Sequence, residues 1–196
     1  MGAETNNTIQ FSQISDGNEE MLLKWRNSED VAPYMYSDHV IESGEHQSWF
    51  KSITQNEERS IYRLICVNND PVGLVSITSI NHELRSCSWA FYLASPNTRG
   101  TGVGQVTEWW AIEYVFNVLN LNRMECEVLV ANDSVIRMHE SFGFRRESYL
   151  RERCWKSGVA LDAVGLSLLK RDWDSVRSNF QVKPKIAAFI ESNRTN

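Results

Sequence analysis

A glycine-rich turn in the middle of the chain constrains its fold more than any other stretch. The turn, Arg99-Gly100-Thr101-Gly102-Val103-Gly104, follows Ser88–Leu93, an apolar run typical of a buried strand. Apolar residues then recur at helical spacing, at Val103, Val106, Trp110, Tyr114 and Val118. Backbone N–H groups at a helix start lack partners and lie at the positive end of the helix dipole. The sequence therefore predicts a strand, a glycine turn and a helix that bind an anion such as a phosphate.

Two common phosphate-binding loops do not match this turn. A P-loop requires Gly-Lys-Ser/Thr, and this chain has Val103-Gly104-Gln105 at that place. A dinucleotide-binding fingerprint follows the first strand of a βαβ unit, whereas this turn comes halfway along the chain, after four predicted strands. Neither class accounts for the turn.

A second block supports one specific resemblance. The stretch Asn132–Phe144 reads Asn-Asp-Ser-Val-Ile-Arg-Met-His-Glu-Ser-Phe-Gly-Phe, and a predicted strand at Met124–Val130 lies between it and the glycine turn. Together the two motifs resemble the Arg-x-x-Gly-x-Gly loop and the Asn-x-x-Ala-x-x-x-Tyr-x-x-x-Gly-Phe helix of the GCN5-related N-acetyltransferases. The resemblance implies an acyltransferase that uses acetyl-coenzyme A as co-substrate and needs no metal.

The composition is that of one folded domain. The chain has 196 residues, of which 42% are hydrophobic and 7 are tryptophan. A net charge of −5 without a basic run disfavours nucleic-acid binding. Cys66, Cys87, Cys126 and Cys154 form neither a zinc motif nor a disulfide framework. Met1–Thr8 is polar, and no apolar run approaches ~20 residues, so we expect a cytoplasmic protein without a membrane segment.

The order of predicted elements gives the fold class. Strands are expected at Ile9–Ile14, Ser60–Val67, Val72–Ile80, Ser86–Leu93, Met124–Val130, Glu147–Lys156 and Val159–Leu169. Helices are expected at Asn18–Asn27, from Ser43, after Gly102 and from Asn132, with Ala32–Ile41 as a loop over the site. This order matches the α/β acetyltransferase fold of the α+β type, a mixed, mostly antiparallel seven-stranded sheet, splayed in the middle and flanked by about four helices. We expect residues 1–171 to form this domain and residues 172–196 a polar extension with a short helix.

The coenzyme contacts follow from the resemblance. In the family, the strand before the turn carries a bulge and splays from its neighbour, and the gap admits the pantetheine arm. That assigns the strand edge at Phe91, Tyr92 and Leu93 to pantetheine. The pyrophosphate would bind the N–H groups of Gly100, Thr101, Gly102, Val103, Gly104 and Gln105, with the Arg99 guanidinium nearby. Asn132 is expected to cap the next helix and, by resemblance, to reach the pantetheine.

The implied reaction is attack of a neutral amine on the thioester carbonyl, which requires a proton for the departing thiolate. A tyrosine usually supplies it in the family, and this chain has His139 at that position. A histidine can donate a proton at neutral pH, so we predict His139 as the acid. Alternatively, His139 only packs near the sulfur and solvent protonates the thiolate.

The base that takes the proton of the amine is harder to name. Glu127, near the middle of its strand, is the candidate, with an ion-paired or solvated glutamate as the alternative. His82, in the turn Asn81–Arg85, is a second candidate on the acceptor side, with an exposed loop histidine as its alternative.

The N-terminal third is expected to select the amine. Trp25-Arg26-Asn27, Met35-Tyr36-Ser37 and Ser76–Asn81 resemble the branch of the family that acetylates UDP-linked 4-amino-4,6-dideoxy sugars in pseudaminic acid biosynthesis for flagellin glycosylation. Met35, Tyr36 and Trp49 would cover the apolar face of such a sugar, and Arg26, Lys24 and Arg85 are available to bind its diphosphate. Alternatively, Trp25 is core and Arg26 pairs with a local carboxylate such as Glu29.

Two other functions stay open at this point. Arg26-Asn27 and Arg171-Asp172-Trp173 look similar to the ribosomal-protein N-terminal acetyltransferases, which need an open groove for a peptide. The other rival is a non-catalytic module that binds acyl-coenzyme A, because the glycines serve binding alone. The exposed strand edges and the apolar patch at Ile186–Ile190 would permit a homodimer.

Overall fold

A computed structural model describes residues 8–55 and 58–194, so the first seven residues of the polar N-terminal stretch lie outside it. Its strands form one sheet in the order β1-β2-β3-β4-β5-β7-β6, in which only the β4–β5 pair is parallel. The strands are β1 (Ile9–Gln13), β2 (Ile61–Val67), β3 (Asp70–Asn81), β4 (Ser86–Leu93), β5 (Arg123–Leu129), β6 (Arg145–Lys156) and β7 (Val159–Leu169). The predicted seven-stranded mixed sheet is confirmed.

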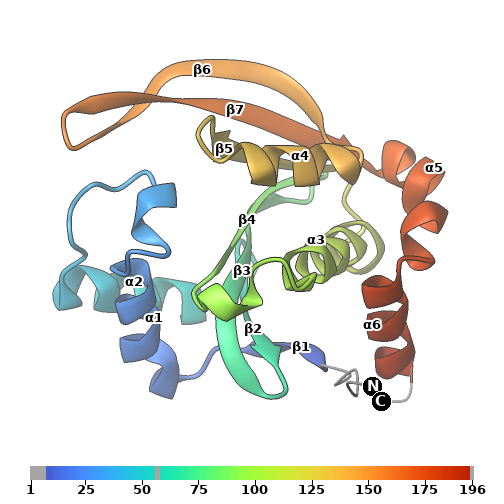
Figure 1. The fold of residues 1–196 in the computed structure, drawn as a ribbon, viewed down its shortest axis with the longest axis horizontal. Helices are drawn as coiled ribbons and strands as arrows, with labels where there is room; N and C mark the ends of the chain where they lie inside the picture. The colour runs from blue at the N-terminus through green and yellow to red at the C-terminus, as the bar shows by residue number, and fades with distance from the viewer. Residues whose placement is uncertain (1–7, 56–57, 195–196) are drawn as a thin grey trace.

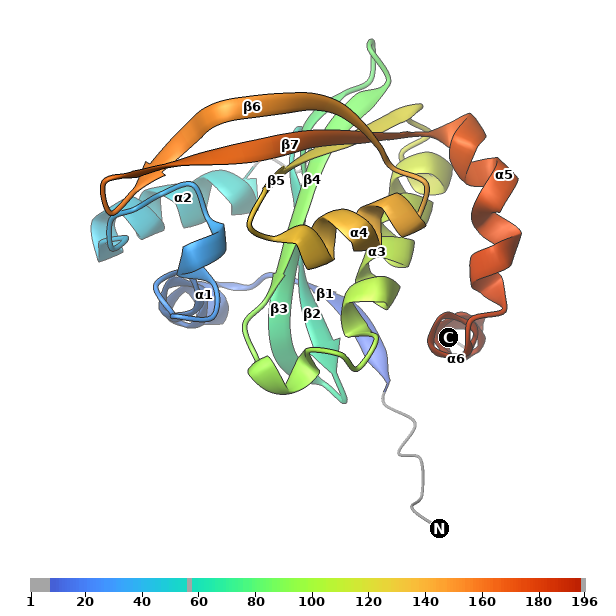
Figure 2. The ribbon, with the colours of Figure 1, turned by 45° about the horizontal axis from the view of Figure 1, so that its top comes forward.

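Across residues 8–55 and 58–194, six α-helices accompany the sheet, rather than about four. They are α1 (Glu19–Arg26), α2 (Ser43–Gln55), α3 (Val103–Glu113), α4 (Asp133–Ser141), α5 (Lys170–Gln181) and α6 (Pro184–Arg194). The chain beyond the last strand therefore folds into two helices rather than the single short one expected. Helices α1 and α2 lie on one face of β2–β4, and α3 and α4 lie on the other, with α5 and α6 outside α3 (Figures 1 and 2).

Each face of the sheet has its own apolar cluster. Leu22 and Phe50 pack against β2 and β3 under α1 and α2. The larger cluster joins the opposite face of the sheet to α3, α4 and the C-terminal helices, through fully buried residues such as Trp173 and Ile186. Burial of aromatic and branched side chains on this scale supplies most of the drive to fold.

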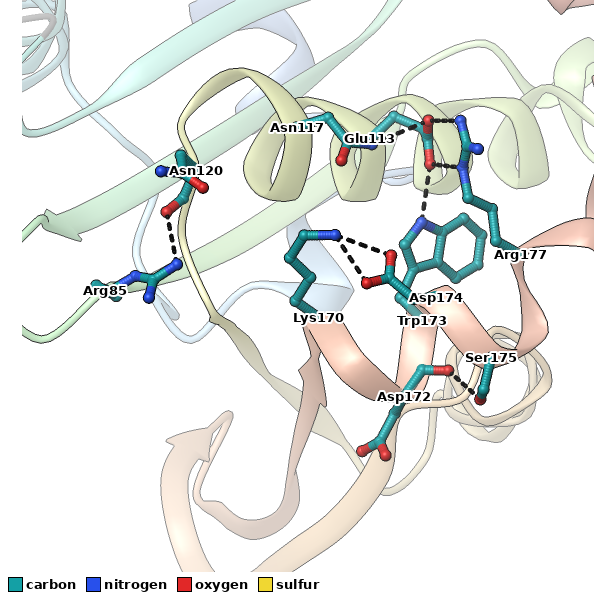
Figure 3. A network of polar contacts seen from close by, with 10 residues as sticks. All are labelled: Arg85, Glu113, Asn117, Asn120, Lys170, Asp172, Trp173, Asp174, Ser175 and Arg177. Atoms are coloured by element: carbon teal, nitrogen blue, oxygen red, sulfur yellow. Dashed lines mark hydrogen bonds and ion pairs between the residues drawn. The ribbon is translucent and has the colours of Figure 1, made fainter.

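The C-terminal helices are part of this core. Glu113 of α3 accepts hydrogen bonds from Trp173 Nε1 at 2.8 Å and from Arg177 Nε at 2.7 Å, which join α5 to α3 (Figure 3). The Trp173 indole also packs edge-on against Trp109, with ring centroids 5.0 Å apart. The sequence reading did not foresee that residues after 171 would complete the packing around α3.

The prediction of one continuous apolar face on the helix after the glycine turn is wrong for the second half of that helix. Val103 and Val106 are buried as expected, but Val118 is 65% exposed. The helix widens into a π-helical turn at Tyr114–Val118, which rotates the last residues away from the predicted face. The sheet, α5 and α6 surround α3. Residues on other sides of this helix, among them Glu108 and Trp109, are therefore buried as well.

The sheet opens between β4 and β5. The two parallel strands pair only from Ser86–Arg123 to Ser88–Glu125, and beyond that point they diverge. The expected bulge is not in β4, whose pairing with β3 is regular from Ser88 to Leu93. The extra residue lies in β3 instead, between Thr78 and Asn81, where Ser79 has a positive φ of 51°. The predicted splay is thus present, with the bulge one strand away.

Candidate active site

The gap between β4 and β5 is part of a cavity of about 700 Å³. Its walls come from the outer halves of both strands, the glycine turn, α4 and the segment between α1 and α2. The predicted residues among its lining are Met35, Tyr36, Phe91, Tyr92, Leu93, Arg99, Gly100, Gly102, Gly104, Gln105, Glu127, Asn132 and His139. Residues from five separate stretches of the sequence thus meet at one place.

The glycine turn has the backbone geometry of an anion site. Gly100 and Gly102 have φ of 74° and 89°, in the left-handed region that favours glycine. The first helical bond of α3 runs from the Val106 N–H to the Gly102 carbonyl, which leaves the N–H groups of Val103, Gly104 and Gln105 without a partner inside the helix. Thr101 departs from the expectation, because its N–H already donates to the Thr98 carbonyl at 3.4 Å.

Buried polar atoms along the cavity fit an arm that carries amides and a thioester. In the described part of the chain, Trp89 Nε1, Tyr92 Oη and Glu108 Oε2 are buried without a hydrogen-bond partner. Buried polar groups are nearly always paired, so such atoms mark a place where a ligand completes the bonding. Trp89 and Tyr92 both line the cavity, on the strand assigned to pantetheine. The residues present therefore fit acetyl-coenzyme A.

Arg99 connects the glycine turn to Asp30. Its guanidinium lies 2.8 Å from Asp30 Oδ1, in the segment between α1 and α2, and half of its side chain is exposed. Asn132 occupies the N-cap position of α4 as expected, but its side chain makes no capping hydrogen bond. Its Oδ1 accepts a hydrogen bond from Ser134 Oγ at 3.5 Å, and the residue lines the cavity.

His139 is buried beside a glutamate that the sequence reading missed. Its Nδ1 lies 2.9 Å from Oε1 of Glu108, and both side chains are almost fully buried. Burial alone would lower the pKa of His139, but the charge and hydrogen bond of Glu108, together with Cys126, raise it to about 10. Burial raises the pKa of Glu108. The one sequence signal for Glu108 is a charged residue between apolar positions of a helix.

Glu127 lies on β5 in the cavity wall, where two donors converge on it. Tyr36 Oη donates to Glu127 Oε2 at 2.8 Å, and Arg153 Nε of β6 donates to the same oxygen at 2.7 Å. The Arg153 guanidinium also lies 4.9 Å from the centre of the Tyr36 ring. Burial and the bond to Glu127 raise the pKa of the Tyr36 phenol, so it stays a donor. Glu127 is thus ion-paired and still lines the cavity.

The segment that carries Tyr36 is attached to the β6–β7 hairpin. Lys156 Nζ donates to the carbonyls of Ala32, Met35 and Ser37 at 2.8, 2.7 and 3.0 Å. The Ser157 N–H donates to Asp38 Oδ2 at 2.6 Å. The hairpin tip accordingly reaches the connection between α1 and α2 (Figure 2). This segment is the loop over the site that the sequence predicted.

Several predicted acceptor residues do not line the cavity. Trp49 packs in the second core, edge-on to Tyr62 at 5.7 Å, because that face of α2 points toward β2. His82 lies exposed in the β3–β4 turn, at the opposite end of β4 from the cavity. Arg26 does not line the cavity, and its side chain is not paired with Glu29. Its Nη2 donates to Ser37 Oγ at 3.1 Å instead. Desolvation lowers the pKa of Arg26, against the opposing charges of Tyr92 and Glu45.

The described residues contain no cluster of three or more His, Cys, Asp or Glu side chains arranged to hold a metal ion. Across residues 8–55 and 58–194, no helix combines the length and the apolar character needed to cross a membrane.

Comparison with known proteins identifies the family. The model of the acetyltransferase (GNAT) domain matches residues 9–145. The acetyltransferase PseH of Campylobacter jejuni is 26% identical over 134 residues, which cover 68% of this chain and 81% of that protein. The spermidine N(1)-acetyltransferase of Vibrio cholerae is 24% identical over 166 residues, which cover 84% of this chain and 95% of the relative.

Solved structures show the same fold. The spermidine N-acetyltransferase of Vibrio cholerae, in a crystal structure with CoA and spermine, superposes with a TM-score of 0.78 at 19% sequence identity, over 85% of this chain and 98% of that one. The glycine turn, the splayed strands and the family match lead to one conclusion: the chain belongs to the GNAT acetyltransferases and is an acetyl-coenzyme A-dependent N-acetyltransferase.

Proposed function

We propose that the acceptor is the 4-amino group of a UDP-linked amino-deoxy sugar of the pseudaminic acid type. The observation that carries this proposal is the charge balance of the cavity. The carboxylates among its lining residues are Asp30 and Glu127, and each is already paired with an arginine, Arg99 and Arg153 respectively. This end of the cavity therefore offers the aromatic rings of Tyr34 and Tyr36 and one carboxylate, Glu127, whose charge is balanced by the neighbouring Arg153.

This balance favours an acceptor with negative charge over a polyamine. A polyamine carries several ammonium groups and needs carboxylates that are free to pair with them. A nucleotide sugar brings a diphosphate, which suits a guanidinium such as that of Arg153. Tyr34, Met35 and Tyr36 line the cavity beside it and would cover the methyl face of a deoxy sugar. Similarity to PseH is consistent with this choice, and similarity to the spermidine enzymes makes spermidine the necessary control.

The same loop argues against a peptide acceptor. A protein N-terminus needs an open groove, whereas the segment with Met35 and Tyr36 is bonded to β5 through Glu127 and to the hairpin through Lys156. These bonds hold the segment over the acceptor end of the cavity. A small amine is therefore a better match than a polypeptide.

Within this proposal each group has a defined task. Acetyl-coenzyme A supplies an acetyl group activated as a thioester. The amide groups of Gly102, Val103 and Gly104, with Arg99, hold its pyrophosphate, and Asn132 reaches its pantetheine. Glu127 takes the proton of the acceptor amine, directly or through a water. His139 gives a proton to the departing thiolate.

The test is a substrate comparison with the purified protein. Thiol release from acetyl-coenzyme A is followed with the UDP-4-amino-4,6-dideoxy sugar, spermidine and an N-terminal peptide, and kcat/KM is compared. We expect the sugar to exceed both others by at least about tenfold, which corresponds to roughly 1.4 kcal/mol in transition-state binding. A higher kcat/KM with spermidine or the peptide would overturn the proposal.

A further inference from the structure

A buried pair of ionisable side chains borders the cavity. Glu108 of α3 is 0% exposed, and His139 of α4 is 3% exposed. Their atoms Oε1 and Nδ1 lie 2.9 Å apart, within hydrogen-bond distance. Charged and titratable residues are almost never fully buried unless they are paired and have a reason to remain. The coenzyme contacts described above do not use Glu108, so the pair calls for an explanation.

The surroundings fix which way the imidazole faces. The ring packs edge-on against Trp89, with centroids 5.1 Å apart, and lies 5.4 Å from the ring of Phe144. Nδ1 is committed to Glu108, so Nε2 is the nitrogen left for other partners. The thiol of Cys126 on β5 interacts with the ring, and both Cys126 and His139 line the cavity. His139 therefore has one ring nitrogen that is not committed to Glu108, in a ring that lines the cavity beside Cys126.

The second oxygen of Glu108 is the other unusual feature. Glu108 Oε2 is buried without a partner. A carboxylate in this position is stabilised by the imidazolium and, at longer range, by Lys183 from the connection between α5 and α6. Burial raises the pKa of Glu108, and the charge of Glu108 raises that of His139 against desolvation. Both shifts favour retention of a proton by the pair.

We propose that Glu108 is a positioning residue that holds His139 protonated and oriented, so that its Nε2 can deliver a proton into the cavity. The inference rests on the proposed function of His139 as the acid and adds the residue through which it acts. In the proposed role, a carboxylate and an imidazole together do the work that one hydroxyl does when the family's tyrosine stands at position 139.

The proposed step transfers the acetyl group from sulfur to nitrogen. The neutral amine attacks the acetyl carbonyl, the new C–N bond forms, and the C–S bond of the thioester breaks. The sulfur departs with the electron pair of that bond and takes a proton from His139 Nε2. The proton lost by the amine leaves through Glu127 or solvent. His139 then regains a proton from solvent, while Glu108 keeps its hydrogen bond to Nδ1 throughout.

Glu108→Gln tests the role, because glutamine keeps the size and the acceptor oxygen but removes the charge. Side-chain NMR of the coenzyme-free protein should show the pKa of His139 fall from about 10 to its ordinary value near 6.5 or below. The ratio of variant to wild-type kcat should then drop about tenfold for each pH unit above that value, because the imidazolium fraction drops tenfold per unit. KM for acetyl-coenzyme A should stay near wild type.

Matched variants separate this role from mere packing. Glu113→Gln alters another α3 glutamate, bonded to Trp173 and Arg177, and its kcat ratio should not vary with pH. His139→Tyr installs the acid typical of the family, and in that background Glu108→Gln should no longer produce a pH-dependent loss. A pH-independent ratio for Glu108→Gln in the His139 background, or a His139 that titrates alike in both proteins, would overturn the inference.

The test of Glu108 does not depend on whether the proposed sugar acceptor is correct. Activity is measured with whichever amine turns over best, so loss of the sugar proposal leaves the pH comparison intact. The NMR titration needs no acceptor at all. Active wild-type enzyme with a flat ratio counts against Glu108 alone, whereas preference for spermidine or a peptide counts against the sugar alone.

Discussion

Arg153 and Glu127 form an ion pair at the acceptor end of the cavity, with Nε 2.7 Å from Oε2. The two residues come from strands that are not neighbours, because β7 lies between β5 and β6 in the sheet. Their side chains are 44% and 39% exposed, so solvent weakens their attraction and the pair adds little stability. Its position therefore matters more for what binds than for how firmly the protein folds.

Arg153→Ala should change acceptor selectivity. Removal of the guanidinium leaves Glu127 with Tyr36 as its one remaining donor and takes away the cation expected to meet a diphosphate. We expect KM for the UDP-sugar to rise about tenfold, within the range for loss of a charged hydrogen bond. KM for spermidine should fall, because a carboxylate is released. Steady-state kinetics with both acceptors measure the two effects.

Arg151→Ala is the matched control, since Arg151 is an exposed arginine of the same strand. Its acceptor KM values should stay near wild type. If Arg153→Ala left both KM values unchanged, the charge argument for a nucleotide sugar would lose its support.

Lys156→Met should loosen the segment between α1 and α2. The ammonium donates to three carbonyls of that segment, and methionine keeps a similar length without a donor. Amide exchange over residues 32–37 should become about tenfold faster, since opening is opposed by fewer bonds. The acceptor KM should rise while KM for acetyl-coenzyme A does not. Lys170→Met, which removes an exposed pair with Asp174 within α5, should show neither effect.

The sequence was informative where local chemistry decides the structure. The glycine turn was predicted from residues that tolerate a positive φ, and Gly100 and Gly102 have φ of 74° and 89°. The turn between β2 and β3 is of the same kind, since Asn68 and Asn69 also have a positive φ, at 53° and 70°. Alternation of apolar residues identified the strands, and each predicted strand is present within a few residues.

Contacts between residues far apart in the chain could not be predicted from the sequence. Lys156 lies 119 to 124 residues away from the carbonyls it binds, and Arg153 meets Glu127 only because the hairpin curves over the cavity. Trp49 was assigned to the site from its type, although the orientation of α2 places it in the core. Glu108 was missed for a related reason, because nothing in a helix sequence says which buried position faces a histidine 31 residues later.

Glu147→Gln should lower stability in a pH-dependent way. Arg123 and Ser167 hydrogen-bond to this carboxylate and lower its pKa from 4.5 to about 2. A group whose pKa is lower in the folded state stabilises the protein above its unfolded pKa, and this gain is lost as the pH falls through the folded pKa. Because the side chain is 47% exposed, we expect only about 1 kcal/mol at pH 7.

Urea unfolding of wild type and Glu147→Gln between pH 7 and pH 3 measures this difference. The gap in free energy of unfolding should be constant above about pH 4.5 and should shrink below it. Glu152→Gln, an exposed residue of the same strand, is the control and should show little gap at any pH. A gap that is as large at pH 3 as at pH 7 would contradict the ionic origin.

Gly102→Ala should weaken coenzyme binding through the backbone. Gly102 has φ of 89°, and a Cβ there would also lie 3.0 Å from Cγ of Lys185 on α6. The lysine stem can move aside, so the strained backbone decides the effect, which costs roughly 1–2 kcal/mol. Relief of that strain would turn the N–H groups of the turn away from the pyrophosphate, so we expect Kd for coenzyme A to rise about tenfold by calorimetry. Gly44→Ala, at a helical start with open space around it, should leave Kd unchanged. Wild-type affinity in a folded Gly102→Ala protein would mean that the pyrophosphate binds elsewhere.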